Sequence, residues 1–153
     1  MRQILSRREV RADRWRYPGE DGDGPRVQTL AELQAAAVPA GPVGVRLAPV
    51  DEVEQLAPYL ESLELVIVHF DSVGDGRGYS QAQLLRDRLG YRGELRAAGA
   101  VRRDQLFLLA RCGFDSFEFA AGEDPRAALA QLDAYSVAYQ RSSGTLVSPN
   151  LRA

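Results

Sequence analysis

The residues best suited to bind a ligand follow an apolar run in the middle of the chain. Asp75-Gly76-Arg77-Gly78-Tyr79-Ser80 comes soon after residues 65–70, which read as a buried strand. An arginine and free backbone N–H groups at the start of a helix favour a small oxyanion, a phosphate or a carboxylate. The same residues also suit a plain tight turn, in which the two glycines supply positive φ angles and Arg77 pairs with Asp71 or Asp75.

A second helix start carries a comparable set of polar side chains. Arg102 and the run from Arg103 to Gln105 follow a weaker apolar segment at residues 94–98. Because the carboxyl ends of parallel strands meet at one edge of a sheet, we expect this helix start to lie near Arg77. The candidate ligand-binding residues are Asp75, Gly76, Arg77, Gly78, Tyr79, Ser80, Arg103, Asp104 and Gln105.

One polar or charged residue interrupts each of four apolar segments. These residues are Arg46, His69, Arg96 and Glu118. Such side chains are costly in strands that are buried on both faces unless they are paired. If the sheet curves, they face one interior and form a polar layer that can bind an anion and move a proton. In the alternative interpretation, Arg96 and Glu118 lie on edge strands or pair across the sheet, and His69 is a satisfied core histidine.

The scarcity of cysteine and histidine limits the chemistry. With one residue of each kind, no intrachain disulfide, Cys-based metal cluster or His-rich metal site can form within the chain. All basic residues are arginine, which excludes a lysine Schiff base and a P-loop lysine. No flavin, nicotinamide or metal motif is recognisable, so the cofactor is left open. Cys112 is a redox thiol or, more simply, a small buried hydrophobe.

Charge and length define the broad class of protein. A formal net charge of -2 gives no bulk attraction to nucleic acid. No apolar run reaches the length of a membrane span, and the N-terminus lacks the apolar segment of a signal peptide, so we expect a cytoplasmic location. The 153 residues, 45% of them hydrophobic, suffice for one domain with a core.

Strand and helix patterns alternate along most of the chain. The expected strands are residues 43–47, 65–70, 94–98 and 116–119. Helices are expected at 51–60, 80–89, 101–112 and 124–139, with capping-box patterns at 51–54 and 80–83. About four such strand–helix units predict an α/β protein with a mainly parallel sheet, as an open layered sheet or as a curved half-barrel.

The two ends of the chain differ from its middle. Residues 1–27 are expected to form a hairpin-like appendage, in which residues 3–5 and 9–10 pair and Trp15 and Tyr17 dock on the core. Residues 28–140 form the α/β domain, which begins with a capping box at 29–32. Residues 141–153 are expected to be a polar tail.

Seven short runs carry a likeness to a known family. They read GVRLAP at 44–49, DGRGYSQA at 75–82, LLR at 84–86, YRGELRA at 91–97, RDQL at 103–106, RCGFD at 111–115 and SVAYQ at 136–140. In these runs, and over roughly residues 42–140, the chain resembles the bacterial domain of unknown function 934. The resemblance supports the site candidates from Arg77 to Ser80 and from Arg103 to Gln105. Where the family has a Phe-Pro-Lys-Phe-type segment this chain has His69, so no role of that lysine carries over.

The family usually carries the label of a probable oxidoreductase involved in sulfite reduction. The resemblance therefore implies an accessory protein of assimilatory sulfate and sulfite reduction, which binds a small oxyanion or contacts sulfite reductase or another sulfur-assimilation protein. A cofactor-dependent oxidoreductase and a metabolite-sensing interaction domain are the alternatives. The residues leave open whether the protein is an enzyme.

Overall fold

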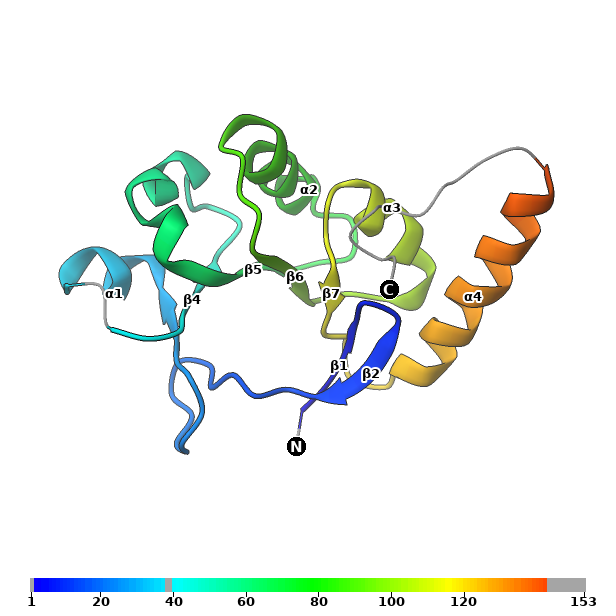
Figure 1. Ribbon diagram of the computed structural model, residues 1–153, viewed down its shortest axis with the longest axis horizontal. Helices are drawn as coiled ribbons and strands as arrows, with labels where there is room; N and C mark the ends of the chain where they lie inside the picture. The colour runs from blue at the N-terminus through cyan, green and yellow to red at the C-terminus, as the bar shows by residue number, and fades with distance from the viewer. Residues whose placement is uncertain (1, 38–39, 143–153) are drawn as a thin grey trace.

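The computed structural model describes residues 2–37 and 40–142 and shows one open, mostly parallel sheet (Figure 1). Seven strands follow the order β2-β1-β7-β6-β5-β4-β3. The parallel strands are β3 (Val27–Thr29), β4 (Val43–Leu47), β5 (Leu63–Phe70), β6 (Glu94–Gly99) and β7 (Ser116–Phe117). An antiparallel pair, β1 (Gln3–Ser6) and β2 (Glu9–Ala12), extends the sheet beyond β7. The predicted α/β class is confirmed, and the sheet is open.

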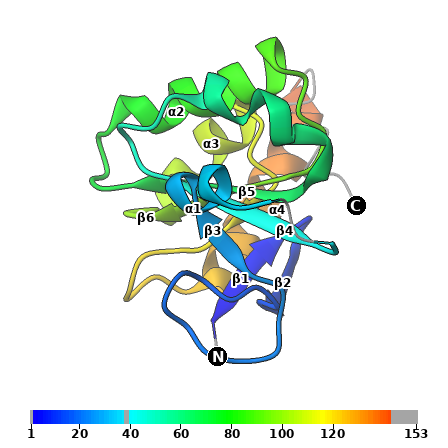
Figure 2. The same ribbon diagram turned by 90° about the vertical axis from the view of Figure 1, so that its left-hand side faces the viewer.

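The parallel strands lie side by side in the order in which they occur in the chain. Because right-handed crossovers that all advance in one direction fall on the same side, the connecting helices cover one face of the sheet (Figure 2). These connections are α1 (Leu30–Ala35), the 3-10 helix η1 (Val53–Ser62), α2 (Gly76–Gln83), the π-helix η2 (Leu84–Arg88), the 3-10 helix η3 (Arg103–Gln105) and α3 (Leu106–Arg111). This winding is that of a barrel segment, so functional side chains are expected at the carboxyl ends of the strands.

Each face of the sheet has its own apolar cluster. Along β5, Val66 and Val68 contact the helices in the larger cluster. Leu65 and Ile67 point to the other side, as the two-residue repeat of a strand requires, and pack near Trp15 in a smaller cluster. The sheet is therefore buried on both faces.

The N-terminal segment forms the cover of that second face. A two-residue turn joins β1 to β2, and both of its residues, Arg7 and Arg8, have positive φ (49° and 67°), as in a type I′ hairpin. Strand β1 then pairs with β7, with Leu5 opposite Phe117. Trp15 is 3% exposed beneath the sheet. The expected hairpin is present, and it joins the main sheet.

Several local expectations were wrong. A further parallel strand, β3, was not expected and directly precedes α1. The capping box of α1, by contrast, is formed by Thr29 and Glu32 as predicted. The capping box expected at 80–83 is absent, because α2 already begins at Gly76 with Asp75 as its N-cap. At 51–54, Asp51 accepts a hydrogen bond from the N–H of Ala48 at 2.7 Å instead of capping the helix.

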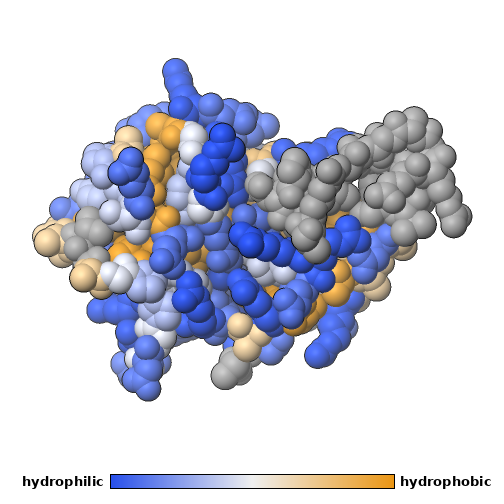
Figure 3. All heavy atoms as spheres, viewed as in Figure 1, coloured by the Kyte–Doolittle hydropathy of each residue, from blue (hydrophilic) through white to orange (hydrophobic). Residues whose placement is uncertain are grey.

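The C-terminal helix α4 (Pro125–Ser142) packs against β1, β2 and α3, and residues 143–153 of the expected tail lie outside the described residues. Hydrophilic residues cover most of the side of the molecule in Figure 3. In the described part of the chain, no helix is both long and apolar enough to span a membrane.

Candidate functional site

At the start of α2, Asp75 and Arg77 form hydrogen bonds with each other. Asp75 accepts a hydrogen bond from the backbone N–H of Arg77 at 3.1 Å. The guanidinium of Arg77 donates to both carboxylate oxygens of Asp75, at 2.9 Å each. The hydrogen bonds from Arg77 lower the pKa of Asp75. An anion at this helix start would therefore compete with a carboxylate that already holds the arginine.

The two glycines beside Arg77 do not provide positive φ angles, so this expectation was wrong. Gly78 is needed for packing, because a Cβ at this position would lie 2.4 Å from the ring of Phe70. A Cβ on Gly76 would meet nothing within 4 Å. Tyr79 packs edge-on against Phe70, with ring centroids 5.3 Å apart. Gly78 and Tyr79 thus pack α2 against the end of β5.

The two helix starts meet through Gln105. Its Nε2 donates to the carbonyl oxygen of Val73 at 2.7 Å and contacts the hydroxyl of Tyr79 at 3.4 Å. Its Oε1 accepts from the N–H of Arg102 at 3.2 Å, which satisfies the start of η3. Gln105 therefore joins the two loops as a structural tie.

The other polar side chains of this edge point to local partners. Arg103 lies 4.0 Å from Glu123. The hydroxyl of Ser80 donates to the carbonyl oxygen of Gly76 at 3.4 Å, and Asp104 lies in the first turn of η3. The hollow beside Arg77, about 600 Å³, is also lined by Asp51, Glu52 and Glu54. These carboxylates oppose the binding of an anion here.

The second set of candidates does come together. Arg46, His69 and Glu118 line one cavity of about 260 Å³ with Tyr17 and Ala98. We call this space the Arg46 cavity; its remaining lining residues are Gly99, Phe119, Ala120 and Ala121. His69 lies opposite Ala98 in the sheet, and the N–H of Glu118 donates to the carbonyl oxygen of Ala97. The small side chain of Ala98 leaves space between the polar residues of its neighbouring strands.

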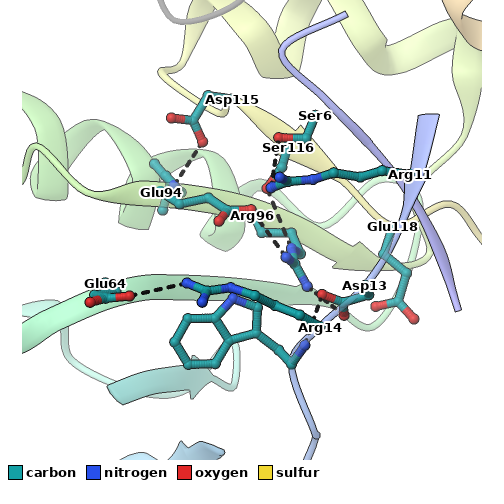
Figure 4. A network of polar contacts seen from close by, with 12 residues as sticks. Ser6, Arg11, Asp13, Arg14, Glu64, Glu94, Arg96, Asp115, Ser116 and Glu118 are labelled. Carbon is teal, nitrogen blue, oxygen red and sulfur yellow. Dashed lines mark hydrogen bonds and ion pairs between the residues drawn. The ribbon is translucent and has the colours of Figure 1, made fainter. Parts of the chain in front are cut away.

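Arg96 lies beside this cavity in a buried polar network (Figure 4). Its side chain is 0% exposed and its Nη1 donates to Asp13 at 2.8 Å and to the hydroxyl of Tyr17 at 3.2 Å. Its Nη2 donates to Glu94 at 3.0 Å. Burial by itself lowers the pKa of Arg96, but the surrounding Tyr17, Glu94 and Asp13 raise it overall. Arg96 therefore stays charged, with its hydrogen bonds directed at structural partners.

A second arginine holds the walls of the Arg46 cavity in place. Arg2 donates to Asp13 at 2.9 Å, its Nε lies 3.1 Å from Glu118, and its guanidinium carbon is 3.5 Å from the centre of the Tyr17 ring. The hydroxyl of Tyr17 donates to Glu118 at 2.8 Å. Burial, above all, raises the pKa of Tyr17 beyond its ordinary value, so the phenol is a neutral donor.

The charges around the Arg46 cavity leave one cation uncompensated. The side chain of Arg46 makes no hydrogen bond or ion pair with any other described residue, and the residue is half-buried. Glu118 is paired with Arg2, and the Nε2 of His69 is 3.5 Å from a carboxylate oxygen of Asp71. A guanidinium with all its donors available, beside an imidazole, is suited to bind an oxyanion.

Gly99 is the residue that allows His69 to lie where it does. It has a φ of 88°, and a Cβ at this position would lie 2.3 Å from the carbonyl oxygen of Phe70 and 2.9 Å from the His69 ring. No signal in the sequence indicated this contact. None indicated Arg2 and Asp13 either, because their partners Glu118 and Arg96 lie far along the chain, whereas Arg96 was detectable as a charge within an apolar strand.

Metal and thiol chemistry find little support elsewhere. The described residues contain no group of three or more His, Cys, Asp or Glu side chains placed to hold a metal ion. Cys112 is 7% exposed, and burial raises the pKa of its thiol. This geometry is that of a small buried hydrophobe.

The fold and the Arg46 cavity define a single-domain α/β protein with sequentially wound parallel strands and a candidate site at their carboxyl ends. The family described as bacterial protein of unknown function (DUF934) matches residues 44–148, and the chain belongs to this family. A search of curated proteins finds no match. The matched region includes Arg46, His69, Arg96 and Glu118, whereas Tyr17 precedes it.

Proposed function

We propose that this protein binds a small inorganic oxyanion in the Arg46 cavity and acts as an accessory protein of assimilatory sulfate and sulfite reduction. The observation that carries the binding function is the half-buried guanidinium of Arg46, which has no partner among the described residues and lines a cavity with His69. The sulfur-assimilation setting rests on the resemblance to the 934 family and its label.

The size of the Arg46 cavity favours a small ligand. Its volume of about 260 Å³ lies below the range of roughly 300–1,000 Å³ that is usual for clefts binding drug-sized molecules. An oxyanion with a few water molecules fits this space better than a flavin or a nicotinamide nucleotide. The proposal therefore favours an anion-binding accessory protein over a cofactor-dependent oxidoreductase.

Ligand binding is tested by thermal shift and calorimetric titration of the purified chain with phosphate, sulfite and sulfate at matched ionic strength. A ligand that binds only the folded state raises its stability by RT ln(1 + [L]/Kd). We expect stabilisation by at least one anion. Arg46→Gln should abolish it because the only uncompensated cation of the cavity is lost.

Arg77→Gln is the matched control for that experiment. It makes the same change at the arginine that Asp75 already holds, so anion binding should be unchanged. Loss of binding in Arg77→Gln with retention in Arg46→Gln would place the site at the start of α2 instead. No stabilisation by any of the three anions would refute oxyanion binding.

The sulfur-assimilation role is tested in cells. A strain lacking the gene should grow poorly with sulfate as the sulfur source and recover when cysteine is supplied, and the tagged protein should co-purify with sulfite reductase. Complementation by Arg77→Gln but not by Arg46→Gln would connect the cavity to the pathway. Normal growth of the deletion strain on sulfate would refute the proposed role.

A further inference from the structure

The Arg46 cavity has an acceptor at one end and a donor at the other. Arg46 lies on β4, and Glu118 follows β7, so β5 and β6 separate them in the sheet. His69 and Ala98 occupy those two middle strands. A ligand between the ends therefore faces guanidinium N–H groups on one side and a carboxylate on the other.

The carboxylate of Glu118 still has unused acceptor positions for a further hydrogen bond. One oxygen accepts from the hydroxyl of Tyr17 at 2.8 Å, and the other lies 3.1 Å from the Nε of Arg2. Each carboxylate oxygen has two acceptor positions, so one donor at each leaves capacity on both. Because Tyr17 already directs its proton at Glu118, its hydroxyl does not supply a further donor to the ligand in this arrangement.

Resting on the proposed function, we infer that the Arg46 cavity selects oxyanions that retain an O–H group, such as hydrogen phosphate or the O–H tautomer of hydrogen sulfite, over fully deprotonated sulfate. A protonated oxyanion can accept hydrogen bonds from Arg46 and donate one to Glu118. Sulfate carries only acceptors near neutral pH. Its oxygens would face the Glu118 carboxylate lone pair to lone pair, which leaves an acceptor unsatisfied and adds charge repulsion.

The selection should be measurable as a ratio of affinities. A site built to accept a hydrogen bond from a ligand discriminates strongly against an analogue that lacks the proton. The cavity is partly open, with Glu118 24% exposed, so we expect a discrimination of at least about tenfold rather than the largest values known for sealed sites.

The experiment titrates the purified chain with phosphate, sulfite and sulfate at one ionic strength and one near-neutral pH. Phosphate or sulfite binding at least about tenfold tighter than sulfate is the expected result. Equal affinity for sulfate would overturn the inference while leaving oxyanion binding intact. Failure of all three anions to bind would instead overturn the proposed function, and the inference with it.

Glu118→Gln provides the matched variant, because the amide keeps the shape of the side chain but supplies a donor. It should weaken phosphate binding and strengthen sulfate binding, so that the ratio falls. An unchanged ratio in a variant that retains the native Trp15 fluorescence would overturn the role of Glu118. If the variant fails to fold, the ratio in the unmodified protein still decides the question.

A pH series distinguishes hydrogen sulfite from phosphate as the protonated ligand. Raising the pH removes the proton of hydrogen sulfite, whereas phosphate keeps one, so sulfite binding should be lost well before phosphate binding. The groups that face the cavity or its walls are Arg46, Tyr17 with Arg96, His69 with Asp71, and Glu118 with Arg2. Because phosphate keeps its proton, its binding shows the effect of titrating these protein groups alone. Parallel loss of sulfite and phosphate binding would contradict selection by the ligand's own proton.

Discussion

Replacing Asp13 by asparagine should destabilise the protein far more than an equivalent change at the surface. The Asp13 side chain is 1% exposed and accepts hydrogen bonds from Arg96 at 2.8 Å and from Arg2 at 2.9 Å. Its other oxygen accepts from the N–H of Trp15 at 3.2 Å. An amide has only one oxygen, so one of these donors must face an NH₂ group in Asp13→Asn.

The magnitude follows from the burial of the pair. Removing one partner of a buried ion pair costs about 3–5 kcal/mol. In Asp13→Asn the two arginines lose the carboxylate that they share, and Arg96 is left with Glu94 as its one carboxylate partner among the described residues. With a urea m-value of about 2 kcal/mol/M, the unfolding midpoint should fall by about 1.5–2.5 M. Such a loss is a large part of the roughly 5–15 kcal/mol that stabilises a typical domain.

Glu64→Gln is the matched control, because it makes the same chemical change in an exposed pair. Glu64 and its partner Arg14 lie 3.1 Å apart, with side chains 53% and 62% exposed. Such surface pairs contribute about 0–1 kcal/mol. The fluorescence of Trp15, the only tryptophan, follows unfolding directly within the N-terminal segment. Equal midpoints for Asp13→Asn and Glu64→Gln would refute the view that the buried network stabilises the fold.

Three further predictions concern single positions. Gly78→Ala should lower the free energy of unfolding in urea by about 1–3 kcal/mol, because its methyl group overpacks against Phe70. Gly76→Ala lies in open space within the same helix and should be neutral or stabilising. Equal effects of the two substitutions would contradict the packing role of Gly78. Burial raises the pKa of Asp115 to about 6 from 3.8, so its proton is held more tightly in the folded state, and stability from this group falls as pH rises through that window. Asp115→Asn should remove this pH-dependent contribution. If the free energies of unfolding of the unmodified protein and of the variant change in parallel between pH 4 and 7, the prediction is wrong. Cys112 should react slowly with a thiol reagent in the folded protein and quickly in urea, and fast labelling without denaturant would show that the thiol is accessible.

The sequence predicted features that depend on short-range patterns. The apolar run at residues 65–70 lies in β5, and Gly90 and Gly113 have positive φ (69° and 106°) at the helix ends where stops were expected. These features could be predicted because a strand or a helix stop depends mainly on residues near it in the chain. The common face of Arg46, His69 and Glu118 could be anticipated from their positions late in successive strands.

Features that depend on distant partners were not predictable. Nothing near Gly78 indicates that its lack of a side chain makes room for Phe70, and nothing near Asp13 indicates that it neutralises Arg96. The role of Arg77 was open for the same reason, since the choice between a free cation and a closed ion pair depends on how Asp75 is oriented. The sequence therefore located the edge of the site better than it identified the arginine that is available there.

The pairing of β1 with β7 has a consequence for how the chain is made. Leu5 lies opposite Phe117, so β1 must wait until the much later β7 has been synthesised before it can join the sheet. Until then Arg96 lacks Asp13, and the apolar face of β5 lacks Trp15. Closing so long a loop is slow compared with forming the neighbouring strand–helix units. Docking of the N-terminal segment should therefore be the final step of folding, and Tyr17 should reach the cavity only then.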